Sequence, residues 1–270
     1  MLRLLTYNAH RCLGTDRRLA PERIVEAVAE ARPDIVALQE VDVGSARTGG
    51  VDQAELITRG LGMVGHFHPV RRVGEGWSGL AVLSRGPSRL VRAGLLPELA
   101  VARGLVPRGA LWVRAEVDGA ALHVVNTHLS LIGRERVRQA AALLGPDWLG
   151  GVEDEPTALL GDFNAVPRSV TYRLVTRFMG DAQRLQEARH RPRPTFPAPL
   201  PTLRLDHVFV GPERVRVVEA SVLRTPLTRV ASDHLPLVVD VEPARVLAAR
   251  EPGAAPPDDA GAASRRERAG

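Results

Sequence analysis

The chain has 270 residues, of which 44% are hydrophobic and 25% are charged, an ordinary globular composition that excludes wholesale disorder. No apolar run approaches the ~20 residues of a membrane-spanning helix, and the lone Cys12 excludes an intramolecular disulfide and a cysteine-rich zinc site. All 36 basic residues behind the net charge of +5 are arginine, which indicates a compositional bias rather than a nucleic-acid-binding surface.

Short apolar runs of strand length recur along the chain. Several are apolar on both faces, which is typical of strands covered on both sides by other layers. The alternation at 112–117 followed by Asp118 and Gly119 predicts a hairpin, so part of the sheet is expected to be antiparallel. The expected strands cover residues 2–6, 35–38, 80–83, 111–117, 121–125, 157–160, 205–210 and 235–241.

Helical stretches fall between these strands. One helix is expected to begin at Pro21, which suits a first helical position, and to end before Pro33. Asp52, with Glu55 three residues later, resembles a capping box at the start of a second helix. A third is expected over 134–144. Strands mixed with helices, including a hairpin, predict an α/β or α+β sheet protein.

The composition changes near the C-terminal end. We expect one domain over residues 1–242, containing a proline-rich extended loop at 191–201, and a disordered tail over 243–270, because the tail carries too little apolar surface to offset its ordering entropy. Truncation after Pro243 is therefore expected to leave the melting temperature and kcat unchanged. A fall of several degrees in the melting temperature would show that the tail packs on the domain.

Polar side chains follow or precede six of the apolar runs. Taken singly, each fits a turn, a cap or a solvated strand end. Their repetition at so many strand ends instead indicates that they converge at one edge of a sheet, where ligands bind. The six stretches are Thr6-Tyr7-Asn8, Gln39-Glu40, Asn126-Thr127-His128, Asp162-Phe163-Asn164, Asp206-His207 and Ser232-Asp233-His234.

The residue types in these stretches indicate the chemistry. Carboxylate and amide oxygens suit a hard cation such as Mg²⁺ or Mn²⁺, whereas zinc would favour more imidazole or thiolate. A histidine beside aspartates supplies a general base. A hard cation together with such a histidine predicts hydrolysis, and the substrate expected for this pair is a phosphoester.

These stretches, in this order, resemble the signature of the endonuclease/exonuclease/phosphatase superfamily of deoxyribonuclease I-like enzymes. The resemblance runs from about residue 2 to 242 and implies a four-layered α/β sandwich with two packed mixed sheets and a site at one edge. The stretch at 47–53 resembles the compact bacterial hydrolases of this superfamily.

The resemblance implies metal ligands. Glu40 matches the principal metal ligand, with Asn8 beside it, and Asp233 matches a supplementary ligand. Asp162 and Asn164 match the pair that handles metal, nucleophile and phosphate.

It also implies catalytic roles. His234 matches the general base and Asp206 the carboxylate that orients it, while His128 matches a residue that contacts the phosphate and stabilises the transition state. Arg108 resembles an arginine that supports the phosphate, although a plain surface role fits it equally well. One departure is His10, where some nucleases carry an acidic residue, and this weakens the case for a second metal.

The expected function is therefore Mg²⁺-dependent phosphoester hydrolysis by a cytoplasmic, monomeric hydrolase without a membrane span. The alternatives are a catalytically silent binding or scaffold protein on the same fold and a zinc hydrolase. The sequence does not choose among nucleic acid, a phospholipid headgroup and a small phosphorylated molecule as the substrate, nor among endonuclease, exonuclease and phosphatase action.

Overall fold

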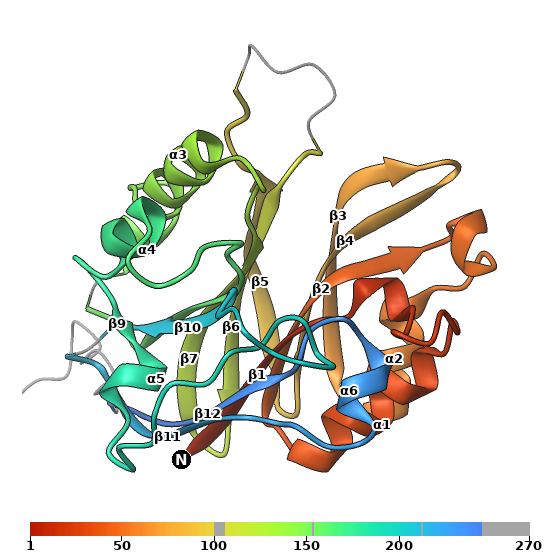
Figure 1. The fold of residues 1–270 in the computed structure, drawn as a ribbon. Coiled ribbons are helices and arrows are strands. Elements are labelled where there is room, and N and C mark those ends of the chain that lie inside the picture. The colour runs from red at the N-terminus through yellow and green to blue at the C-terminus, as the bar shows by residue number, and fades with distance from the viewer. Residues whose placement is uncertain (100–105, 153, 212, 245–270) are drawn as a thin grey trace, which may run out of the picture.

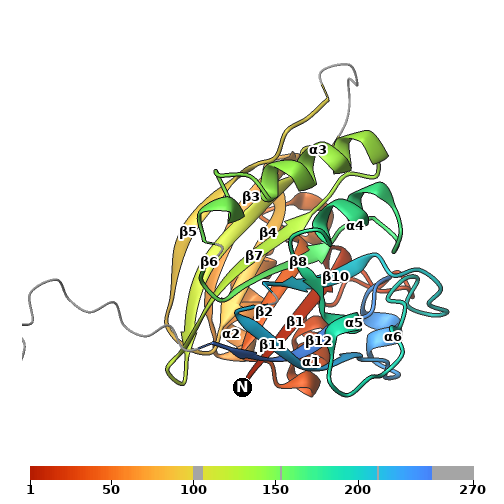
Figure 2. The same ribbon diagram turned by 90° about the vertical axis from the view of Figure 1, so that its left-hand side faces the viewer.

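The computed structural model describes residues 1–99, 106–152, 154–211 and 213–244. Two six-stranded sheets face each other through the middle of the molecule, and helices cover their outer faces (Figures 1 and 2). The first sheet has the order β11-β12-β1-β2-β4-β3. Its strands are β1 (Leu2–Asn8), β2 (Ile35–Val43), β3 (Val64–Val73), β4 (Gly76–Ser84), β11 (Val215–Val222) and β12 (Leu237–Pro243).

The second sheet has the order β5-β6-β7-β8-β10-β9. Its strands are β5 (Ser88–Leu95), β6 (Gly109–Val117), β7 (Ala120–His128), β8 (Thr157–Asp162), β9 (Gly180–Asp181) and β10 (Asp206–Val210). The α-helices are α1 (Pro21–Ala31), α2 (Gln53–Leu61), α3 (Gly133–Leu143), α4 (Val170–Val175), α5 (Ala182–Leu185) and α6 (Thr228–Ala231). Single 3-10 turns are η1 (His10–Cys12), η2 (Ala46–Thr48) and η3 (Leu149–Gly151).

Three buried apolar clusters separate four layers. One lies between the two sheets, a second between the first sheet and the α1–α2 layer, and a third between the second sheet and the α3–α4 layer. Most of the central strands are therefore covered on both faces, which is why they are apolar on both faces. The four-layered sandwich implied by the resemblance is confirmed.

The strand directions bring selected strand ends to one edge. β1 runs parallel to β2, and β7 runs parallel to β8, so each pair ends on the same side of its sheet. β6 and β7 form the predicted hairpin, in which Asp118 and Gly119 have φ angles of 51° and 75°, the left-handed pair that a tight two-residue turn requires.

Hydrogen bonds of buried polar side chains also join the two sheets. Gln39 on β2 donates from Nε2 to Asn126 Oδ1 on β7 at 2.7 Å. Asn126 in turn donates to the carbonyl oxygens of Leu38 and Ala81 at 2.8 and 2.9 Å. Because both side chains are fully buried, these bonds satisfy groups that would otherwise be costly and help to fix how the sheets pack.

The eight expected strands and three expected helices are all present. Asp52 caps α2 by accepting a hydrogen bond from the Glu55 amide at 2.8 Å. The strands β3, β5, β9 and β11 were not predicted from the sequence. Among the described helices, none is both long and apolar enough to span a bilayer. β12 ends at Pro243, and the rest of the predicted tail from residue 245 onward lies outside the described residues.

The thiol of Cys12 is expected to be inert in the native protein. The side chain is fully buried under the first sheet, and burial raises the pKa of this thiol to about 12. At pH 8 the reactive thiolate is therefore almost absent. A colorimetric thiol reagent should label the protein only after unfolding in denaturant. Fast stoichiometric labelling of the folded protein would contradict this.

Candidate active site

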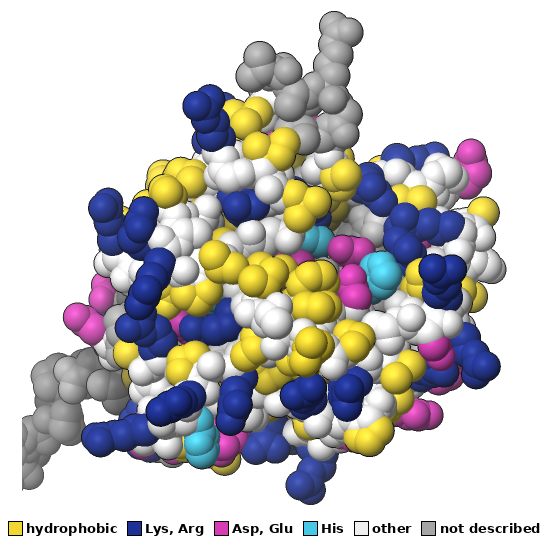
Figure 3. All heavy atoms as spheres, viewed as in Figure 1, with side chains coloured by type: hydrophobic (Ala, Val, Ile, Leu, Met, Phe, Trp, Pro, Cys, Tyr) yellow, Lys and Arg dark blue, Asp and Glu magenta, His cyan; other side chains and the backbone are white. Residues whose placement is uncertain are grey.

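Strand ends from both sheets meet at one edge of the sandwich. In the second sheet, Asp162 at the end of β8 stands in register with His128 on β7 on one side and with Asp206 on β10 on the other. The first sheet contributes Asn8 at the end of β1 and Glu40 on β2. Figure 3 shows acidic and histidine side chains gathered where this face of the molecule is hollowed. The strand-end side chains therefore lie together at one edge of the sandwich, as the sequence predicted.

Asn8 links two carboxylates across the gap between the sheets. Its amide nitrogen lies 3.0 Å from Asp162 Oδ2 and 3.3 Å from Glu40 Oε1, and its amide oxygen accepts from the His10 backbone at 3.0 Å. As placed, Asn8 therefore turns its donor, not its oxygen, toward the carboxylates. Direct ligation of a cation by Asn8 would require this amide to turn over.

Glu40 occupies an irregular point of its strand. The pairing of β2 with β4 shifts register between Leu38 and Val41, and Glu40 has a left-handed φ of 53°. Such a backbone is uncommon for a residue with a side chain, and it persists where the surrounding structure holds it. The bulge directs the partly exposed carboxylate of Glu40 into the hollow, while the neighbouring Gln39 faces the interior.

His234 and Asp206 form a buried pair. His234 Nδ1 lies 2.8 Å from Asp206 Oδ2, so the histidine donates from Nδ1 and leaves Nε2 toward the site, 3.7 Å from Asp162 Oδ2. Burial lowers the pKa of His234, but the carboxylates of Asp206 and Asp162 outweigh this and raise it. The neighbouring carboxylates thus make this ring a strong base.

His128 is held by Asn164. Asn164 Nδ2 lies 3.1 Å from His128 Nε2 and donates to the Leu129 carbonyl at 3.0 Å. His128 Nδ1 is 3.9 Å from Glu40 Oε1. Burial strongly lowers the pKa of His128, so this ring is neutral at physiological pH. His128 Nε2 also lies 3.4 Å from Asp162 Oδ2, so the ring stands between the carboxylates of Asp162 and Glu40.

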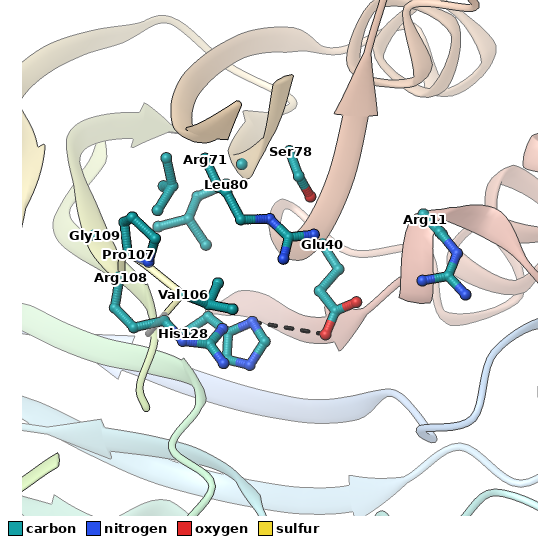
Figure 4. Close-up of a pocket in the computed structure, with 12 residues that line it drawn as sticks. Arg11, Glu40, Arg71, Ser78, Leu80, Val106, Pro107, Arg108, Gly109 and His128 are labelled. Carbon is teal, nitrogen blue, oxygen red and sulfur yellow. Dashed lines mark ion pairs between the residues drawn. The ribbon is translucent and has the colours of Figure 1, made fainter. Parts of the chain in front are cut away.

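The remaining two candidates are Asp233 and Arg108. Asp233 places a carboxylate oxygen 3.7 Å from His10 Nδ1, and its side chain is about one third exposed. Arg108, immediately before β6, lines the pocket that also contains Glu40 and His128 (Figure 4). The structure thus places all the predicted side chains at this edge, with Asp233 beside His10 and Arg108 in the pocket beside His128.

Some neighbours of the site were not assigned to it from sequence. Phe196, in the proline-rich loop, packs against His234 with ring centroids 4.8 Å apart. Thr195 in the same loop is fully buried, and its hydroxyl accepts from the Asp206 backbone at 3.4 Å. Arg71 on β3 lines the pocket beside Glu40. The sequence held no signal for Phe196 and Thr195 beyond the composition of their loop, and none for Arg71, because the approach of these residues to the site depends on tertiary packing.

The donor set can accommodate a metal ion. Asp162, Asp206 and His234 each present a ligand atom within 4.8 Å of the others. Asp162 and Glu40 also share the Asn8 amide as a hydrogen-bond donor. Burial raises the pKa of Asp162, and the charge of Asp206 adds to this. A cation would relieve this concentration of negative charge, so the site is electrostatically suited to one.

The chain resembles known proteins over almost its whole described length. The Endonuclease/Exonuclease/phosphatase family model matches residues 5–234, which include every residue of the cluster. The uncharacterized protein YbhP of Escherichia coli (strain K12) is 32% identical over 251 residues, covering 88% of this chain and 95% of that protein.

Solved structures agree in fold. An endonuclease/exonuclease/phosphatase from Beutenbergia cavernae DSM 12333 has a TM-score of 0.70 at 24% identity, over 90% of this chain and 72% of its own. The catalytic domain of human Nocturnin has a TM-score of 0.68 at 25% identity, over 89% of this chain and 94% of its own.

Proposed function

Because the chain belongs to the endonuclease/exonuclease/phosphatase family, we propose that it is a Mg²⁺-dependent phosphoesterase that activates water with His234. The observation that carries the proposal is the buried His234–Asp206 pair, whose free Nε2 faces a carboxylate cluster at the open edge of the sheets. A base oriented by a carboxylate and placed beside a site for a cation is an arrangement suited to hydrolysis of a phosphoester.

The oxygen-rich side of the cluster fits a hard cation. Glu40 and Asp162 would hold it, with Asn8 adjoining both and Asp233 on the flank. Oxygen donors favour Mg²⁺, with Mn²⁺ as the nearest substitute. When bound, the cation supplies positive charge that stabilises the phosphoryl oxygens in the transition state. A site made instead from Asp162, Asp206 and His234 would sacrifice the 2.8 Å bond that orients the base.

The side chains around the site have distinct roles in the proposed reaction. In the neutral form of the ring, Asp206 holds His234 in the tautomer that leaves Nε2 free to take a proton from water. His128, kept neutral by burial, stands between Asp162 and Glu40, where it can contact the phosphate, and Asn164 fixes the ring. Arg108 stands on the flank to contact the phosphate. These groups are in place before substrate arrives, so they stabilise developing charge without reorganisation.

A hydrolysis assay tests the proposal. Bis-p-nitrophenyl phosphate should be hydrolysed in Mg²⁺, not in EDTA, and again after Mg²⁺ is restored. Zinc that co-purifies, with no response to added Mg²⁺, would indicate a zinc hydrolase. Complete inactivity under all these conditions would favour a catalytically silent binding or scaffold protein.

The substrate class is tested by a panel. DNA, RNA, phospholipid headgroups and small phosphorylated molecules should each be assayed with the wild type and with Glu40→Ala as the inactive control. Hydrolysis that persists in the Glu40→Ala protein would point to a contaminant.

A further inference from the structure

A pocket of about 250 Å³ opens directly beside Glu40 and His128. It lies between the two sheets: β3 and β4 form one wall, and the segment that leads into β6 forms the other. Figure 4 shows Arg71 reaching across it toward Glu40, with Arg108 beside His128. Apolar side chains complete the walls, namely Val70, Leu80, Val106 and Pro107.

A β-bulge directs Arg71 into this pocket. Consecutive residues of a strand normally point to opposite faces. The pairing of β3 with β4 shifts register between Pro69 and Arg71, so Val70 and Arg71 both line the pocket. Bulges that turn a side chain in this way are common beside active sites.

The neighbouring Arg72 has structural partners, whereas Arg71 has none of this kind. Arg72 stacks on Trp77, with its guanidinium carbon 5.0 Å from the ring centroid, and lies 3.9 Å from Glu75. Arg71 has no ion pair and no side-chain hydrogen bond with any residue that the structure describes, although it is partly buried.

Arg108, on the other wall, is also without an ion pair in the described ranges, and its Nε is buried without a partner. Burial lowers the pKa of the Arg108 guanidinium; Asp162 and Glu40 counteract this in part, and the charge of Arg71 adds to it. The pocket is thus lined by three guanidinium groups, those of Arg11, Arg71 and Arg108, and the charges of Arg71 and Arg108 repel each other. Glu40 is the one carboxylate among its lining residues, and it faces the proposed cation.

We propose that this pocket binds a second anionic group of the substrate, so that the preferred substrate is a small phosphoester that carries a further phosphate. The inference rests on the proposed function, since Glu40 and His128 mark where the scissile phosphate would lie. Guanidinium groups match phosphate oxygens in geometry and charge. The volume lies just below the usual range of ligand sites, which suits a compact group or the phosphorylated end of a strand rather than a duplex.

The first test asks whether the pocket binds an oxyanion at all. Thermal melts in EDTA should be recorded with increasing sulfate at constant ionic strength, for wild type, Arg71→Gln and the control Arg72→Gln. Sulfate stabilises proteins generally, so the difference between variants is the signal. We expect sulfate to raise the melting temperatures of the wild type and Arg72→Gln by the same amount, and to raise that of Arg71→Gln by less. Identical shifts in all three proteins would overturn the proposal.

The second test asks for the substrate class. Inhibition of bis-p-nitrophenyl phosphate hydrolysis is measured for two matched pairs: adenosine 3′,5′-bisphosphate with adenosine 5′-monophosphate, and a 5′-phosphorylated with a 5′-hydroxyl dinucleotide. In one pair the extra phosphate should improve inhibition by about tenfold or more. The Arg71→Gln substitution should abolish that gain and leave inhibition by the compound without the extra phosphate unchanged.

The pair in which the extra phosphate improves inhibition shows whether the pocket prefers a small bisphosphate or the phosphorylated end of a strand. No gain in either pair, or a gain that survives in Arg71→Gln, would overturn the inference. If the wild type hydrolyses nothing, the proposed function fails, while the sulfate melts still decide whether the pocket binds anions.

Discussion

Replacing His234 by alanine is expected to lower kcat by ~10²–10⁴-fold, the usual contribution of general base catalysis. The ring is the one base in the described cluster that is oriented through Nδ1 by a buried carboxylate and has its Nε2 free. Because His234 is buried against Phe196, the melting temperature must be measured alongside, and His234→Gln supplies a variant of similar size. His190→Ala, at a side chain 60% exposed, is the matched control.

Near-wild-type turnover by a folded His234→Ala protein would remove His234 from the mechanism. The pH profile gives a second check. Asp206 raises the pKa of His234, so Asp206→Asn should lower that pKa. The base works in its neutral form, so the rise of kcat with pH should move to lower pH in Asp206→Asn, with a smaller maximum. A profile that does not move would mean that His234 is not the titrating base.

Much of the site could be predicted because its residues interrupt apolar runs. Asp162 ends a fully buried strand and Asp206 begins one, so each polar side chain stands out in the sequence. The same pattern also marked Asn126, which faces the interior and joins the sheets. Sequence alone could not separate these cases, because the direction of a strand side chain depends on register and bulges.

Two of the four unpredicted strands, β3 and β5, share a different property. β3 and β5 are mostly half-buried or exposed and carry several arginines, so they lack the apolar signal of the inner strands. Each also pairs through a register shift, which breaks the two-residue alternation. The contact of Phe196 with His234 was unpredictable for another reason: the loop is distant from His234 in sequence and its composition indicates only an extended backbone.

Glu40→Ala is expected to remove the stabilisation of the protein by Mg²⁺ while leaving the stability without Mg²⁺ nearly unchanged. The side chain is partly exposed at the open edge, and its described hydrogen bond is one from Asn8 at 3.3 Å. Losing a bond of this kind costs about 0.5–1.5 kcal/mol. Removing a negative charge beside Asp162 offsets this cost, because the nearby carboxylates repel each other.

Binding of Mg²⁺ to the native state stabilises the wild type by mass action, ~2.7 kcal/mol at a hundredfold excess over Kd. Thermal melts across a Mg²⁺ titration should therefore show a rising melting temperature for the wild type and a nearly flat one for Glu40→Ala. Glu75→Ala, at a side chain 99% exposed, should behave like the wild type. If Glu40→Ala and Glu75→Ala gain equally from Mg²⁺, the cation is held elsewhere, and the group formed by Asp162, Asp206 and His234 becomes the site to test.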